Sequence, residues 1–443
     1  MPRRSVVPLV IGTFVLRMNT GAGGIVLGLF LASLAAHTGY AITSLQVGLL
    51  SVVFFITELS LAPAMGALSD RWGRRLFMIV GPLLGLLHVA LLPFTPVAQP
   101  LPYLLGLQVI AGLSSAMTIP TVLGYLADFT SRDVTRRVRL MSFYELATSG
   151  GIGAGVVLGG FAWDHFGRGA FGMLALFYLT AALCMFVSPT IVRRVDHGQM
   201  RAVAARYLRI LRTPRLFIFI PAWICLSALL GVWFSSQLTF VLSKPRPALH
   251  QLFVGAMSGP GGGSHLSLVL GGYVLFFGLC LLFWAFFLKR VPRLLLMLTS
   301  VAGVYLACAA LLAINHSTGS NPALVVWVPV LLLGSFAESS FAPSALAYLA
   351  DISEESVADR GLLMGLYSVF LGLGQLLGNG LGGVFAHTWG FDGLVYLTAL
   401  LACVALISLL ALYQQERRLA RRDAANAAVD ESNVHEPSAI VDS

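Results

Sequence analysis

Besides a histidine, His88, four acidic or basic side chains lie inside long apolar segments, where a charge is costly. Arg17, Glu58, Glu145 and Glu338 each interrupt such a segment. Insertion scales put the cost of a charge at the centre of a membrane helix at roughly 2.5–3.5 kcal/mol, so each side chain should have a partner or a polar cavity. A carboxyl group can bind and release a proton, and a guanidinium can bind an anion. These four residues are therefore candidates for ligand binding and proton transfer.

Arg17 is followed by glycines on one side of its segment. Gly21, Gly24 and Gly28 come at spacings of four, three and four residues, which places them and Arg17 on one face of a helix. A guanidinium beside a glycine-lined groove suits an anionic or polar substrate. It suits an acidic side chain equally well, so a substrate-binding role and structural pairing both stay open.

Glu338 is a candidate for both substrate binding and proton coupling. The alternative is a neutral acid that forms a hydrogen bond with Ser335 or Ser339. Further polar candidates for substrate binding lie in other apolar segments: Asn19, Gln108 and Gln237. A group of aromatic residues either forms a wall for an amphipathic substrate or meets lipid: Trp223, Trp233 and Phe234.

Glu58 and Glu145 are the other candidates for proton coupling, and pairing within the protein is the alternative for each. We expect Glu58 to face polar groups of a later segment, such as Gln375 and Asn379. His88 also lies in an apolar segment, and we expect a structural role for it.

The elements that hold these side chains are membrane-spanning helices. Of 443 residues, 57% are hydrophobic and 11% are charged, whereas an ordinary soluble protein has about 25% charged residues. This balance excludes a soluble globular enzyme and a disordered chain. We count twelve apolar segments long enough to cross a bilayer: residues 6–36, 44–66, 75–95, 101–127, 138–163, 169–190, 215–242, 266–288, 293–314, 323–350, 361–386 and 390–413. The sequence thus predicts an all-α polytopic membrane protein.

The net charge of +9 reflects orientation in the membrane rather than nucleic-acid binding. With both termini in the cytoplasm, 24 of the 28 lysines and arginines fall in cytoplasmic segments and three in outside loops, as the positive-inside rule requires. The predicted location is the cell membrane (inner or plasma membrane). The sequence shows no GxxxxGK[ST], HExxH or GxSxG site, so we expect no enzyme activity, cofactor or metal.

The chain contains an internal repeat. Residues 120–167 align without gaps on residues 343–390, with 17 identities in 48 positions. An offset of half the chain indicates two halves of the same topology. The predicted domains are an N-terminal six-helix bundle, a cytoplasmic central linker with an amphipathic pattern, a C-terminal six-helix bundle and a disordered tail: residues 1–190, 191–215, 216–413 and 414–443. The outside loop 243–265, which is rich in glycine, should be flexible.

The connection after the second segment reads Gly66-Ala-Leu-Ser-Asp-Arg-Trp-Gly-Arg-Arg75. It resembles the signature loop of the major facilitator superfamily, G-x-L-[AS]-D-R-x-G-R-R, between spans 2 and 3. With the twelve spans and the repeat, the resemblance covers residues 5–413. It implies twelve transmembrane helices in two pseudo-symmetric six-helix bundles, with few charges in the central cavity.

In that family the loop is a conformational latch between the two halves, whereas a simpler interpretation is that its arginines only set orientation. Glycines permit a tight turn, and an aspartate can accept hydrogen bonds from arginines and from the first amides of a helix in the other half. The ends of spans 4 and 10 resemble related acid-and-arginine elements. The latch residues are Gly66, Asp70, Arg71, Gly73, Arg74, Arg75, Asp128, Arg137, Asp351 and Arg360.

Two further stretches resemble exporters of the superfamily only in part. Gly151, Gly155 and Gly159 follow the glycine pattern of the span 5 motif of proton-coupled exporters, but Val156 stands where that motif has proline. Ordinary packing of small residues explains the same spacing. In span 4, Gln108 stands where those exporters often have an arginine.

The resemblance implies a secondary active transporter that works by alternating access. We expect proton-coupled efflux of amphipathic, drug-like compounds, as in drug/proton antiporters. The first alternative is a facilitator or importer of an anionic metabolite bound by Arg17, and the second is a non-transporting sensor or lipid-interacting protein on the same fold. The expected partners are a small-molecule substrate, protons or another coupling ion, and the lipid bilayer, with the chain acting as a monomer.

Overall fold

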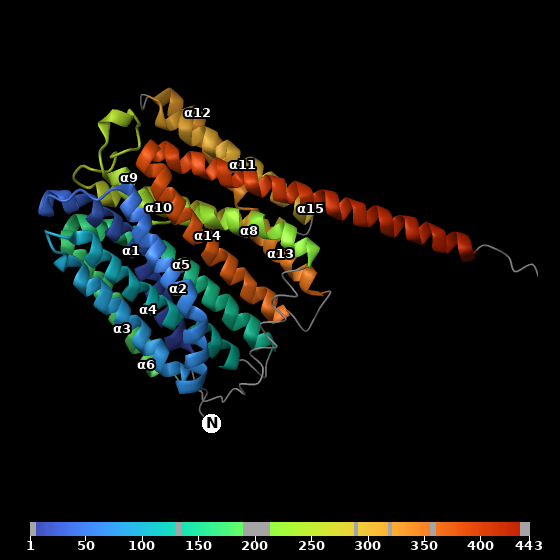
Figure 1. The fold of residues 1–443 in the computed structure, drawn as a ribbon, viewed down its shortest axis with the longest axis horizontal. Coiled ribbons are helices and arrows are strands. Elements are labelled where there is room, and N and C mark those ends of the chain that lie inside the picture. The colour runs from blue at the N-terminus through green and yellow to red at the C-terminus, as the bar shows by residue number, and fades with distance from the viewer. Residues whose placement is uncertain are drawn as a thin grey trace, which may run out of the picture.

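The computed structural model is built from helices, and it describes residues 6–129, 134–188, 213–287, 291–317, 321–354 and 360–434 (Figure 1). The first half of the chain, which we call the N-half, contains α1 (Val7–Thr38), α2 (Ser44–Trp72), α3 (Arg74–Leu91), η1 (Leu92–Phe94), α4 (Pro100–Phe129), α5 (Val134–Phe166), η2 (Gly167–Gly169) and α6 (Ala170–Val187). The second half, the C-half, contains α8 (Pro214–Trp233), α9 (Ser236–Ser243), η4 (Pro247–Leu249), α10 (Gly262–Phe287), α11 (Arg293–Asn315), α12 (Asn321–Glu338), α13 (Phe341–Glu354), α14 (Arg360–Trp389) and α15 (Phe391–Val434).

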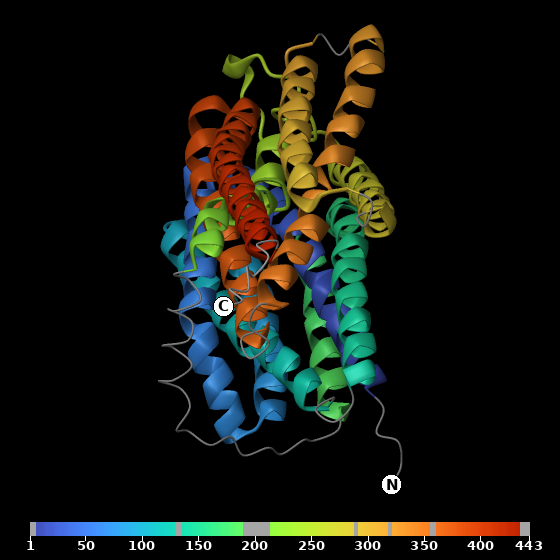
Figure 2. The ribbon, with the colours of Figure 1, turned by 90° about the vertical axis from the view of Figure 1, so that its right-hand side faces the viewer.

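The prediction of twelve spans is confirmed for the part of the chain that the structure describes. Eleven stretches are long and apolar enough to cross a membrane, and one of them, Phe143–Val187, is 45 residues long. That stretch holds both α5 and α6, which the short helix η2 joins, so it supplies two spans. Figure 2 shows the blue-to-green N-half and the yellow-to-red C-half as two neighbouring bundles.

Two spans of the C-half are broken, although the apolar segments 215–242 and 323–350 predicted continuous helices. Span 7 consists of α8 and α9, and the side chain of Ser235 caps α9 by accepting from the amide of Gln237. Span 10 consists of α12 and α13, separated at Ser339 and Ser340. Pro343 lies in the first turn of α13, where its missing N–H costs no helical hydrogen bond, whereas further inside a helix it would.

One expectation about the end of the chain is wrong. Helix α15 continues to Val434, so residues 414–434 are helical where we expected disorder, because this stretch is rich in alanine, arginine and glutamine, which favour helices. In the 243–265 connection, Gln251 donates to Asp392 at 2.9 Å, and Asp392 also accepts from Asn315 at 2.7 Å and His316 at 2.7 Å at the end of α11. The linker predicted at 191–215 lies outside the described residues, apart from the segment from residue 213 onward, where α8 begins.

The internal repeat is visible in the packing of the helices. In the N-half, a Cβ added to Gly155 of α5 would lie 2.0 Å from the carbonyl oxygen of Met18 in α1. In the C-half, a Cβ added to the equivalent Gly378 of α14 would lie 2.0 Å from the carbonyl oxygen of Ala228 in α8. The glycine pattern of span 5 therefore places two helix backbones in close contact, and it does so in both halves.

The two halves meet at one end of the molecule. We call the end with the α1–α2, α5–α6 and α9–α10 connections the distal end, and the end with residue 7 and the extension of α15 the terminal end. At the distal end, a Cβ on Gly48 of α2 would lie 2.8 Å from Cα of Gly383 in α14. Helix α9 is buried along its whole length and packs on α1, α2 and α14. The distal end is therefore closed.

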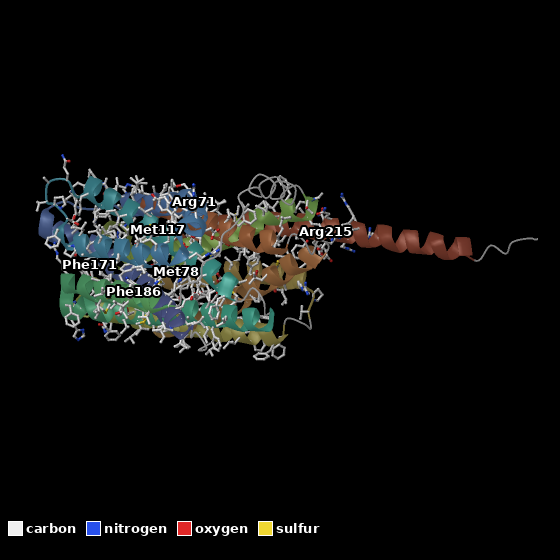
Figure 3. All side chains as sticks on the ribbon, turned by 90° about the horizontal axis from the view of Figure 1, so that it is seen from below. Arg71, Met78, Met117, Phe171, Phe186 and Arg215 are labelled. Carbon is white, nitrogen blue, oxygen red and sulfur yellow. The ribbon has the colours of Figure 1, made fainter. Side chains whose placement is uncertain are left out.

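Away from this seam the two bundles run at an angle to each other. In Figure 1 they fan apart from the region where α1, α2 and α9 meet. Figure 3 labels Arg71 at the end of α2 and Arg215 at the start of α8, and these two arginines of the terminal end lie well apart.

Candidate functional site

The N-half carries a cluster of charged side chains from three helices. Arg17 of α1 donates a hydrogen bond to the hydroxyl of Tyr144 in α5 at 3.5 Å. Glu58 of α2 accepts a hydrogen bond from Ser115 of α4 at 2.7 Å. Arg17 also interacts electrostatically with the carboxyl groups of Glu58 and Glu145. The structure thus brings three of the candidate residues together, and the positive charge has two acidic neighbours.

Glu58 accepts its hydrogen bond from Ser115 of its own half, and the part of the structure that is described places Asn379, one of the suggested neighbours, in a bond with Gln375. The amide of Asn379 donates to the carbonyl oxygen of Gln375 in its own helix at 2.9 Å. Asn379 is buried where α14 packs on Gly231 of α8. Helix α14 also packs on α2 next to Glu58, because a Cβ on Gly372 would lie 2.6 Å from Cδ2 of Leu59. Helical spacing alone does not show which of these neighbours each face of α14 meets.

The glycines next to Arg17 do not form the open groove that we expected. A Cβ on Gly21 would lie 2.2 Å from the carbonyl oxygen of Ile152, and one on Gly28 would lie 2.6 Å from Cβ of Thr239. Only Gly24 has open space around it. Helices α5 and α9 therefore fill most of this face, and the space beside Arg17 is limited to about one turn of α1.

The C-half carries one acidic candidate, Glu338, at the break of span 10. It is the last residue of α12 and is partly buried. Its carboxyl group lies within electrostatic reach of Tyr273 in α10 and Cys308 in α11. Ser335 forms a hydrogen bond with Tyr273, and the hydroxyl of Ser339 donates to the carbonyl oxygen of Phe336 in the last turn of α12. The two serines that we considered as partners of Glu338 are thus engaged elsewhere.

Aromatic rings extend from Tyr273 along α10. The ring of Phe234, at the break of span 7, lies 6.2 Å from that of Tyr273, and the ring of Phe277 lies 5.9 Å from that of Tyr273. Trp223 packs in the core of the C-half. Trp233 packs against the same core and donates to Thr398 at 3.0 Å. The sequence pointed to Phe234 but not to Tyr273 or Phe277, because α10 is apolar on all sides and its periodicity selects no face.

The three polar candidates are buried among helices. Asn19 is 3% exposed and donates to the carbonyl oxygen of Leu174 in α6 at 3.1 Å. Gln108 is 5% exposed in α4, and Gln237 is fully enclosed in α9. Asn19 therefore joins two helices of the N-half. None of the three faces open space in this conformation. His88 is likewise buried in α3.

The loop with the superfamily resemblance forms a tight turn between α2 and α3. Gly73 has a φ angle of 101°, which a side chain would disfavour. Gly66 lies inside α2 and takes no part in the turn, contrary to our expectation. Asp70 and Arg74 form an ion pair at 2.7 Å. Arg75 donates to the carbonyl oxygen of Phe186 and lies 4.8 Å from the centre of its ring.

The remaining latch candidates lie within helices, and their side chains fall outside the part that the structure describes. The helices are α4, α5, α13 and α14, and the residues are Asp128, Arg137, Asp351 and Arg360. Their predicted role stays a prediction. Arg71 is the last basic residue of α2.

Two bundles of membrane-spanning helices related by an internal repeat, with few ionisable side chains inside the spans, define a membrane transport protein. The chain belongs to the Major Facilitator Superfamily, because the model of that family matches residues 9–262 and 247–439. This confirms the resemblance that the loop between spans 2 and 3 indicated.

Similar sequences include multidrug transporters. The chain is 29% identical to Multidrug resistance protein 1 of Bacillus subtilis (strain 168) over 138 residues, which are 31% of this chain and 34% of that protein. It is 29% identical to the multidrug efflux pump LfrA of Mycolicibacterium smegmatis over 124 residues, 28% of this chain and 24% of that one. The chain thus spans about a third or less of the length of these relatives.

Similar solved structures cover nearly the whole chain. The nucleoside transporter NupG has a TM-score of 0.69 and 15% identity, and the match covers 92% of this chain and 98% of NupG. A D-xylose-proton symporter has a TM-score of 0.64 and 14% identity, with 92% and 96% covered. At this identity the likeness shows the fold.

Proposed function

We propose that this transporter exports amphipathic, drug-like compounds by alternating access and uses protons as the coupling ion. The observation that carries the proposal is the position of Glu338 at the break of span 10, beside Tyr273. An acid at a helix break is accessible to a ligand in a way that an acid within a continuous helix is not. The names of the two multidrug relatives support the choice of substrate class.

The surroundings of Glu338 suit an organic cation with an apolar body. Phe234, Tyr273 and Phe277 offer aromatic faces, which bind apolar groups and attract cations. The carboxylate of Glu338 would balance the charge of such a substrate. A proton and a cationic substrate then compete for the carboxylate of Glu338. A proton that reaches Glu338 from one side of the membrane therefore displaces the substrate toward that same side.

The N-half cluster would be the second place for protons. Arg17 has two acidic neighbours, Glu58 and Glu145. Protonation of either carboxylate removes a negative charge that balances the positive charge of Arg17. The structure is closed at the distal end. We infer that the terminal end, with both chain termini, faces the cytoplasm, as the distribution of basic residues indicates.

The alternative of an anionic metabolite bound by Arg17 has less support. Two carboxyl groups interact with this guanidinium, and α5 and α9 occupy most of the glycine face beside it. An anion would have to displace one of those acids. If Arg17 does bind the substrate, Arg17→Ala should abolish binding of the anion, whereas unchanged affinity removes the alternative.

Transport by purified protein in liposomes tests the proposal, with ethidium as the fluorescent probe. We expect an imposed pH gradient to drive ethidium transport by the wild type. Glu338→Gln should leave passive exchange but remove the response to the gradient, and Glu416→Gln, outside the apolar part of α15, serves as the matched control. Flux that ignores the gradient in the wild type would refute proton coupling. Coupling that survives in Glu338→Gln would refute the role of this residue, and no flux at all would favour the non-transporting alternative.

A further inference from the structure

A carboxylate of the N-half caps a helix of the C-half at the distal end. Asp164, near the end of α5, accepts hydrogen bonds from the backbone amides of Ser264 at 2.7 Å and Gly263 at 3.2 Å. Both amides belong to the first turn of α10, which begins at Gly262. The acceptor thus comes from the other half of the chain, about 100 residues away.

The first turn of α10 has no acid of its own. The first four amides of a helix lack partners within the helix, and a negative charge near them is stabilising because of the helix dipole. The sequence of α10 contains no acidic residue in its first turn. Asp164 therefore supplies charge-assisted hydrogen bonds, which are about twice as strong as neutral ones.

Close packing of the backbones of α5 and α10 makes the contact of Asp164 possible. One turn before Asp164, a Cβ on Gly160 would lie 1.8 Å from the carbonyl oxygen of Gly263. Ser267 of α10 accepts from the amide of Gly160 at 2.8 Å and donates to the carbonyl oxygen of Val156 at 2.7 Å. These bonds hold α5 and α10 close enough for the carboxylate to reach the helix start.

A second contact closes the same end. Lys244, just after α9, donates to the carbonyl oxygen of Ile42 in the α1–α2 connection of the other half. Burial, and to a lesser degree the charge of Arg246, lowers the pKa of Lys244. Lys244 and Asp164 thus each join one half to the other at the distal end.

We propose that Asp164 is the latch of the distal gate: by capping α10 from the opposite half, it holds the distal end closed, and its release accompanies opening. The inference rests on the alternating access proposed above. Asp70 provides the contrast at the terminal end, because its ion pair is with Arg74 of its own half. With the distal end closed, Asp164 contacts the opposite half of the chain, whereas Asp70 of the signature loop forms its ion pair within its own half.

Distances between spin labels on the two halves test this proposal in the purified full-length protein. We would replace the five native cysteines by alanine and attach labels at Val97 and Leu252, exposed residues of the distal connections. Asp164→Ala should raise the ratio of distal-open to distal-closed molecules about tenfold, which corresponds to about 1.4 kcal/mol. His165→Ala is the control, because its ring contacts a carbonyl oxygen of its own helix.

A second variant removes the same contact from the other side. Ser264→Pro deletes the closer of the two amides that donate to Asp164, and this amide lies in the first turn of α10, where an N–H has no partner within the helix. The double variant should open no further than Asp164→Ala alone, because the proline removes one of the two hydrogen bonds that the alanine removes together. Effects that add in full would show that Asp164 acts on the fold of α5 and would overturn the proposal, as would an unchanged distribution in Asp164→Ala.

Gly48→Leu separates failure of the latch from failure of the proposed transport cycle. A side chain at Gly48 meets the backbone of Gly383 and should force the distal end apart. If Gly48→Leu opens the distal end and Asp164→Ala does not, only the role of Asp164 is refuted. If neither variant opens it, alternating access at this end is refuted together with the latch.

Discussion

A single methyl group added at Gly155 measures how much the close packing of α1 and α5 matters. A Cβ there would lie 2.0 Å from the carbonyl oxygen of Met18, and a carbon–oxygen contact relaxes to about 3.3 Å. The helices must therefore separate locally by more than about 1 Å. Overpacking of this kind costs about 1–3 kcal/mol, which outweighs the roughly 0.5–1 kcal/mol gained when alanine replaces a helical glycine.

We expect Gly155→Ala to lose about 1–2 kcal/mol of stability, which corresponds to roughly 2–8 °C in apparent Tm for a half of this size. The measurement is the fraction of monodisperse protein that remains after heating in detergent. Gly378→Ala, the repeat-related variant, should lose a similar amount. Gly24→Ala and Gly172→Ala are the controls, because each has nothing within 4 Å of the added carbon. If Gly155→Ala is as stable as these controls, the packing argument for the glycine pattern is wrong.

Two further variants separate structural from functional polar groups. Asn19→Leu removes the hydrogen bond to the carbonyl oxygen of Leu174 and should lower the free energy of unfolding by about 1 kcal/mol. The KM for ethidium should stay unchanged. A raised KM would show that Asn19 belongs to the substrate site. Asp392→Asn weakens three hydrogen bonds and should cost about 1.5–3 kcal/mol, seen as faster hydrogen–deuterium exchange in residues 250–257; exchange like that of the wild type would show that this acid does not anchor the loop.

The spans and the repeat were predictable because they depend on composition and spacing. An apolar run long enough to cross a bilayer must be a helix, and the glycine pattern of span 5 recurs in span 11 at a fixed offset. The breaks in spans 7 and 10 were harder to predict from the sequence. Pro343 marks a helix start in the C-half, whereas its repeat partner Pro120 lies inside the continuous helix α4.

The surroundings of the candidate residues could not be deduced from spacing alone. Helical periodicity groups Arg17 with three glycines, but only the packed structure shows that α5 and α9 cover two of them. The same limit applies to Asn19, which faces α6. Charge was the more reliable guide, since an acid or a base at lipid depth needs a partner wherever it lies, and Arg17, Glu58 and Glu145 did come together.

The extension of α15 beyond the bundle bears on how this protein can be handled and observed. The helix continues for 21 residues past Tyr413 to Val434, which at 1.5 Å per residue is about 30 Å. In Figure 1 it projects alone from the terminal end. A fluorescent protein or affinity tag joined after this helix would be carried at a distance comparable to the thickness of the bilayer core. Such a tag would allow the protein to be detected or purified without contacting the terminal end of the two bundles, which moves during alternating access.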